Sequence, residues 1–166
     1  MKINDLYTPS YIEERISQLY MEKGILTPDD LSIENILTKF NFFVMEGDLS
    51  FAIAEFGGII LPRGLNREAY IEKFHHEFTH LLFHSGNQKM MNYLSRQKQE
   101  QDAQNYVLFT CIPYHMLHYI DFEHEDIVEH TCELFNVPAN IAKTRIKKMK
   151  NQLLINCPEQ LLSIVL

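Results

Sequence analysis

Five consecutive residues constrain this chain more than any other stretch: His76-Glu77-Phe78-Thr79-His80, the pattern H-E-x-x-H. Residues four positions apart lie on the same face of an α-helix, so His76 and His80 can bind one zinc ion. Glu77 follows the first histidine by about 100° of rotation, which puts its carboxylate beside the open coordination position. From there it can take a proton from a zinc-bound water. The pattern predicts a metal-bearing helix with an acid-base residue next to the ion.

The residues around the pattern predict a helix with two unlike faces. Asn66 suits the N-cap position at its start. Projected at 100° per residue, His76 and His80 fall opposite a stripe of apolar side chains, namely Ile71, Phe74, Phe78, Leu81 and Leu82. One face would then be anchored in the core and the other open to a cleft. Histidines with a merely structural role in the core would not be expected to lie off the stripe at ligand spacing.

Two further histidines offer alternatives. His84 lies four residues beyond His80, so these two form a second possible pair. His76 and His80 are preferred because they bracket Glu77, and His76 and His84 are about 12 Å apart, too far to share one ion. His75 points toward the apolar margin and is interpreted as structural.

A catalytic zinc needs three protein ligands and one open position, so a further ligand must come from elsewhere. Residues 99–112 are expected to form a helix that Pro113 ends. On this helix Glu100 shares a face with the small or apolar residues Ala103, Val107 and Cys111. Such a face lets the helix pack closely on the first one and deliver one carboxylate to the metal. Asp102 projects to the far side and is the weaker candidate.

The only strand-prone region precedes the metal helix. Residues 42–45, 51–56 and 59–61 are β-prone, and turns that contain glycine separate them. They predict a small three-stranded antiparallel sheet packed on the H-E-x-x-H helix, with Pro62 at a strand end. A plain structural role for this sheet is favoured over an exposed edge that accepts an extended peptide.

Composition and charge exclude several classes of protein. A net charge of −7 argues against a general binder of nucleic acid or anionic membranes. The basic residues of the last helix, Arg145 among them, scatter around it and are interpreted as a solvated or protein-docking face. The chain has neither an N-terminal apolar leader nor a run long enough to cross a membrane, so a cytoplasmic protein is expected. The three cysteines are interpreted as reduced.

The metal-site pattern resembles a known family. His76-Glu77-x-x-His80, followed by Glu100-x-x-Ala103 and closed by Pro113, is similar to the ImmA/IrrE family of gluzincin-like zinc metallopeptidases. That family continues H-E-x-x-H with E-x-x-A-N-x-F-A and a leucine-rich stretch that ends in proline. Similar features upstream and downstream extend the resemblance over roughly residues 30–150. The departures, which are conservative in size, are Gln104 for Asn, Tyr106-Val107 for Phe-Ala and Thr110-Cys111 for leucines; Phe78-Thr79 also replaces the commoner Leu-Gly.

The resemblance implies a function and a residue set. His76, His80 and Glu100 would be the ligands of Zn²⁺, and Glu77 the general base of an endopeptidase. The substrate would be a helix-turn-helix repressor, cleaved to relieve repression of a phage or mobile element, with no nucleic-acid or membrane partner. The residue that stabilises the oxyanion is open among Tyr93, Tyr114 and His115.

The predicted fold class is α+β: a helical, zincin-like domain with the small sheet on its metal helix. We expect a single metallopeptidase domain over residues 1–166, with N-terminal helices in 1–40, the sheet and metal-site helices in 41–113, and C-terminal helices in 114–166. The alternative function is a non-proteolytic antirepressor that keeps the zinc fold and sequesters the repressor. The presence of Glu77 favours the protease, because a pure binder has no need for it. A purely structural zinc would require a fourth protein ligand, for which His84 and His115 are the residues to check.

Overall fold

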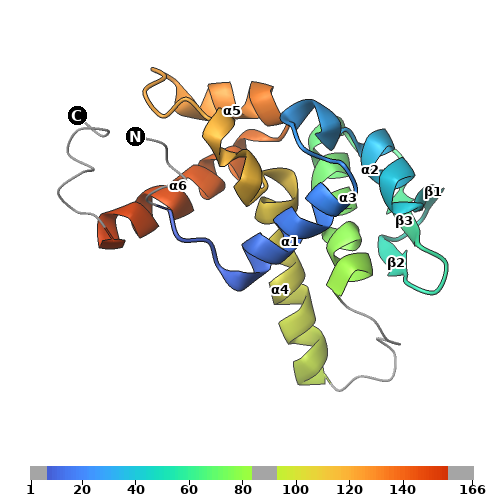
Figure 1. The fold of residues 1–166 in the computed structure, drawn as a ribbon. Helices are drawn as coiled ribbons and strands as arrows, with labels where there is room; N and C mark the ends of the chain where they lie inside the picture. The colour runs from blue at the N-terminus through green and yellow to red at the C-terminus, as the bar shows by residue number, and fades with distance from the viewer. Residues whose placement is uncertain (1–6, 84–92, 157–166) are drawn as a thin grey trace.

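The computed structural model describes residues 7–83 and 93–156, which form six α-helices, two short 3₁₀ helices and three strands (Figure 1). The helices are α1 (Tyr11–Glu22), η2 (Pro28–Leu31), α2 (Ile33–Phe40), α3 (Arg67–Phe83), α4 (Tyr93–Cys111), η4 (Tyr114–Tyr119), α5 (Ile127–Phe135) and α6 (Ala139–Asn156). The strands are β1 (Phe43–Gly47), β2 (Phe51–Ile53) and β3 (Gly58–Pro62). This architecture confirms the predicted α+β class. Over the described ranges, no helix combines the length and apolar character that a bilayer crossing requires.

Local sequence signals account for several helix ends. Asn66 is the predicted N-cap of α3: its side-chain oxygen accepts a hydrogen bond of 2.9 Å from the backbone N–H of Ala69. Helix α4 ends at Cys111, just before Pro113, as predicted. In the N-terminal region Ser32 caps the start of α2, so η2 remains a separate turn before it.

The sheet differs from the predicted antiparallel meander. Its strand order is β1-β3-β2, and β1 pairs with β3 in parallel, while only β2 and β3 are antiparallel. The antiparallel prediction was therefore wrong for β1. Strand β3 takes the central position because residues 58–61 are apolar or glycine and all four are buried. The two edge strands are the more exposed ones.

Helix α3 lies between the sheet and α4 (Figure 1). Its most extensive contacts are with α4, followed by those with β2 and β3. The predicted apolar stripe is buried for Ile71, Phe74 and Phe78, and the ring of Phe78 contacts those of Phe40 and Phe42. These contacts fix how α3 is rotated about its axis. The side that carries His76 and His80 therefore faces away from this aromatic cluster.

A buried ion pair joins the first helix to the last. Arg145 of α6 donates to the carboxylate of Glu13 of α1 at 2.6 Å, and the two residues are 0% and 2% exposed. The hydroxyl of Tyr7 also donates to Glu13 at 2.6 Å. Burial works to raise the pKa of Glu13, but Arg145, Tyr7 and Ser10 outweigh it, so the pKa lies below its ordinary value.

Acid is expected to remove the contribution of this pair to stability. Because folding lowers the pKa of Glu13, its stabilising effect is complete above the ordinary value of 4.5 and is lost as the pH falls through the folded pKa. We expect the stability advantage of the wild type over Glu13→Gln to shrink as the pH is lowered below about 4.5. Urea unfolding of both proteins at a series of pH values measures it. An advantage that stays constant with falling pH would contradict the assignment.

Candidate metal centre

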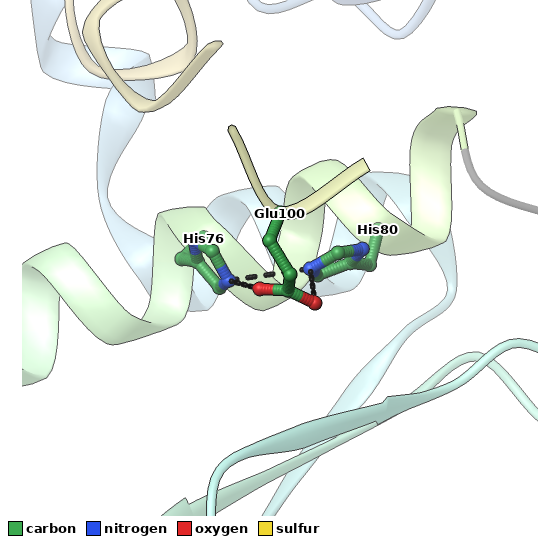
Figure 2. Close-up of side chains that lie close together, drawn as sticks. All are labelled: His76, His80 and Glu100. Atoms are coloured by element: carbon green, nitrogen blue, oxygen red, sulfur yellow. Dashed lines mark hydrogen bonds and ion pairs between the residues drawn. The ribbon is translucent and has the colours of Figure 1, made fainter. Parts of the chain in front are cut away.

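Three side chains from two helices converge on one point. His76 and His80 come from α3 and Glu100 from α4, and Figure 2 shows their ring nitrogens and carboxylate oxygens turned toward one another. The Nε2 atoms of the two histidines are 3.2 Å apart. Glu100 places Oε2 at 3.1 Å from Nε2 of His76 and Oε1 at 3.4 Å from Nε2 of His80. Among the residues that the structure describes, this is the one group of histidine, cysteine and acidic side chains arranged as metal ligands.

The separations of the three donors fit a tetrahedral ion. Ligand atoms held at about 2.0–2.1 Å from zinc in tetrahedral geometry lie about 3.3–3.4 Å from one another. The two Nε2 atoms, 3.2 Å apart, are close to that spacing, and each has one oxygen of the Glu100 carboxylate at a similar distance, Oε2 at 3.1 Å from His76 and Oε1 at 3.4 Å from His80. Two imidazoles and a carboxylate also match the donor set of catalytic zinc sites that keep one position open. The group can therefore hold a metal ion.

The small face of α4 explains how Glu100 reaches α3. Ala103, Val107 and Cys111 are at most 4% exposed, and they continue the line of Glu100 along α4. Short side chains let the two helices approach closely, so the carboxylate at the free end of this line lies beside the histidines. Asp102, the weaker candidate, does not join the group. The exposed fractions fall from 47% for the Glu100 side chain to 4% for His80, so the site opens to solvent on the α4 side.

Glu77 lies next to this group and is held by a residue that the sequence did not indicate. Its side chain is 5% exposed, and Oε1 accepts a hydrogen bond of 2.6 Å from the hydroxyl of Ser50. Burial raises the pKa of Glu77, while the Ser50 hydrogen bond and the charge of His76 oppose the rise. Ser50 lies in the connection between β1 and β2, 27 positions from Glu77. No local pattern marks a contact over that distance.

A cleft of about 580 Å³ opens beside these side chains. The lining includes His76, Glu77 and Glu100 from the site, Ser50 from the connection between β1 and β2, and Lys73 from α3. Helix α6 supplies part of one wall, which was not predicted. Its lining residues are Asn140, Ile141 and Thr144.

Three further residues singled out in the sequence, His75, Tyr114 and His115, make contacts of their own. His75 is 4% exposed and its Nδ1 pairs with the hydroxyl of Thr110 at 3.1 Å; burial lowers its pKa to about 3. Nε2 of His115 pairs with the carbonyl oxygen of Ile25 at 3.1 Å, and the ring of Tyr114 packs against that of Tyr7. Neither Tyr114 nor His115 is among the described residues that line the cleft. His84 and the side chain of Tyr93 fall outside the described residues.

Comparison with known proteins identifies a family whose model matches this chain. Residues 37–147 match the model of the IrrE N-terminal-like domain, a peptidase family designated M78. Two proteins of Bacillus subtilis strain 168 are similar in sequence. The "Phage-like element PBSX protein XkdA" is 32% identical over 111 residues, which cover 65% of this chain and 56% of that protein. The "Uncharacterized protein YqaB" is 28% identical over 145 residues, 84% of each chain. No solved structure matches the chain.

Proposed function

Because this chain belongs to the ImmA/IrrE family of M78 peptidases, we propose that it is a zinc-dependent endopeptidase that cleaves a helix-turn-helix repressor of a phage or mobile element. The observation that carries the peptidase part is the convergence of His76, His80 and Glu100 beside the buried carboxylate of Glu77. The name of XkdA, a protein of a phage-like element, supports the link to mobile elements. The repressor as substrate follows from what the family resemblance implies.

Each ligand of the proposed site would contribute one atom: Nε2 of His76, Nε2 of His80 and a carboxylate oxygen of Glu100. When bound there, zinc would lower the pKa of a coordinated water toward about 7 and polarise the carbonyl of the scissile peptide. The cleft beside the three residues leaves room for an extended segment of substrate.

Glu77 performs the proton transfers in this proposal. Its carboxylate takes a proton from the attacking water as the bond between water oxygen and carbonyl carbon forms, and then gives it to the leaving amine as the C–N bond breaks. Because Ser50 donates to Oε1, the carboxylate is held in one orientation and Oε2 is left to carry the proton. The raised pKa makes Glu77 a stronger base than an exposed glutamate.

The direct test is cleavage of a defined protein. The zinc-loaded protein is incubated with the purified repressor encoded beside its gene, and the products are mapped by mass spectrometry. We expect one cut site, no cutting by the chelator-treated protein, and recovery when zinc is added back. Binding of the intact repressor without any cleavage would support the antirepressor that acts by sequestration and would refute the peptidase.

Replacing Glu100 by alanine is expected to lower the affinity for zinc by more than about 100-fold. The reason is that even residues that only support a ligand contribute 10–100-fold, and Glu100 supplies one of three donors here. Asp102→Ala on the same helix is the matched control and should leave zinc affinity unchanged. Competition with a chromogenic chelator measures the dissociation constant of each variant. Equal zinc affinities of the wild type and Glu100→Ala would show that Glu100 is not a ligand of the metal.

A further inference from the structure

A second cavity, of about 610 Å³, lies on the side of α3 opposite the cleft. On α3 its lining residues are Arg67, Tyr70, Ile71 and His75. Those of the cleft, Glu72, Lys73 and His76 among them, fall on the opposite face of the helix at 100° per residue. No described residue lines both cavities. The second cavity is therefore separate from the metal site, and the proposed hydrolysis does not use it.

The walls of the second cavity are mainly apolar. They include Leu31 of η2, Leu37 of α2, Val44 of β1, and Leu134 and Phe135 of α5. A cavity of several hundred cubic ångströms, with apolar walls and a few polar groups, is typical of sites that bind small molecules. The size and the lining thus fit a small organic ligand.

His75 offers a ligand in this cavity a hydrogen-bond acceptor. The ring is 4% exposed and no carboxylate among the described residues pairs with it, so it is neutral. Thr110 directs its hydroxyl hydrogen to the carbonyl oxygens of Tyr106 and Val107, so its oxygen accepts from Nδ1–H of His75. The other ring nitrogen, Nε2, is then an acceptor, and within the described ranges it has no hydrogen-bond partner. Because His75 lines the cavity, an O–H or N–H of a ligand can satisfy this acceptor.

Acidic side chains outnumber basic ones at the second cavity. Asp29, Glu34 and Glu133 line it and are exposed. None of the three forms an ion pair in the described part of the chain. Arg67 lines the cavity as well, and it donates to the carbonyl oxygen of Asn136 at 3.1 Å. Three unpaired carboxylates against one guanidinium give the cavity a negative potential, which favours a ligand with a positive charge.

The pKa of Tyr70 responds to the same negative charge. Burial raises the pKa of this phenol above its ordinary value, and the charges of Glu34 and Glu46 raise it further. Tyr70 lines the second cavity, so the field of Glu34 acts at the cavity wall.

We propose that the second cavity binds a small organic amine that has an apolar body and an O–H or N–H donor. The apolar body lies against the leucine and phenylalanine side chains, the donor satisfies Nε2 of His75, and the ammonium faces the three carboxylates. The inference does not rest on the proposed peptidase function, because binding needs neither catalysis nor a protein substrate. The amine lies beside the contact of the two metal-bearing helices, since His75 directly precedes His76 and bonds to Thr110 of α4.

Tyramine is the probe that tests this proposal, because it combines an aromatic ring, a phenolic O–H and an ammonium group. Two analogues each lack one feature: phenethylamine has no hydroxyl, and 4-ethylphenol has no amine. Isothermal titration calorimetry with the zinc-loaded protein measures the dissociation constants. We expect about 0.1–1 mM for tyramine, ordinary for a ligand of this size, and binding of each analogue weaker by about 5-fold or more.

Variants of the protein locate the probe. Glu133→Gln removes one carboxylate of the second cavity and should weaken tyramine binding by about 3–5-fold. Glu72→Gln, in the cleft, is the matched control and should leave the dissociation constant within about twofold. His75→Phe keeps a ring and removes the acceptor, so in this variant tyramine should lose its advantage over phenethylamine.

Several results would overturn the proposal. Tyramine that does not bind at about 10 mM, or that binds no better than either analogue, would refute the ligand class. A loss of affinity in Glu72→Gln and not in Glu133→Gln would assign the probe to the cleft. An advantage of tyramine that persists in His75→Phe would remove His75 from the site. If His75→Phe does not fold, the two amines on the wild type still test the acceptor, and Glu34→Gln repeats the charge test with the same expected direction.

Discussion

Replacing Glu77 by glutamine is expected to lower the rate of peptide-bond hydrolysis by about 10²–10⁴-fold while zinc stays bound. Glutamine keeps the size of the side chain and can still accept the hydrogen bond from Ser50, but its amide cannot take a proton from water. The donors of the proposed metal site are His76, His80 and Glu100, so the change removes none of them. Initial rates on the repressor and the zinc content of the purified variant are the two measurements.

The same variant separates the two functions considered for this chain. A sequestering antirepressor needs no base, so Glu77→Gln should then relieve repression as fully as the wild type. The matched control is Glu72→Gln, a second carboxylate that lines the cleft, and it should retain most of the activity. Loss of zinc from Glu77→Gln would contradict the role assigned here. Unchanged hydrolysis would do so too.

Replacing Arg145 by methionine is expected to destabilise the protein by about 3–5 kcal/mol. The variant leaves the carboxylate of Glu13 buried at 2% exposure without its counter-charge. Arg145 also donates Nε–H to the carbonyl of Ile112 and lies 4.9 Å from the centre of the Phe109 ring, so both contacts are lost as well. The free energy of unfolding in urea at neutral pH measures the effect.

Two companion variants test the cause of that loss. Lys147→Met changes an exposed base on the same helix and should stay within about 0.5 kcal/mol of the wild type. Adding Glu13→Leu to Arg145→Met removes the unpaired charge and should recover part of the stability, because a well-packed apolar pair can replace a buried ion pair. A double variant less stable than Arg145→Met would show that packing at α1 and α6, not charge, determines the result.

The residues of the candidate site were predictable where helix periodicity determines them. His76 and His80 share a face because they are one turn apart, and Glu100 was found because the small residues after it predict a closely packed helix. Ser50 was not predictable, because its contact with Glu77 depends on how the sheet lies against α3. Within the sheet, the pattern of apolar residues indicated strands, but it did not determine which strand would be central.

The burial of Arg145 was also not predictable from the sequence. Arg145 lies among several lysines in α6 and was interpreted as part of a solvated or protein-docking face, yet it is fully buried. Basic residues that are neighbours along a helix cannot be distinguished by the sequence pattern. Their burial depends on which side of the helix packs against a distant acidic residue in the fold. Glu13 is 132 positions away. Only the tertiary fold distinguishes this arginine from Lys147 and Lys148, which remain exposed.

The division of the candidate centre between two helices has a consequence for how the protein is made. A ribosome releases Ser50, His76, Glu77 and His80 before it releases Glu100, so a chain that ends at α3 has the base and two imidazoles but lacks the third donor. Helix α4 must be synthesised and must dock on α3 before the set is complete. For the proposed peptidase, the ability to cut proteins therefore cannot precede the synthesis and docking of α4.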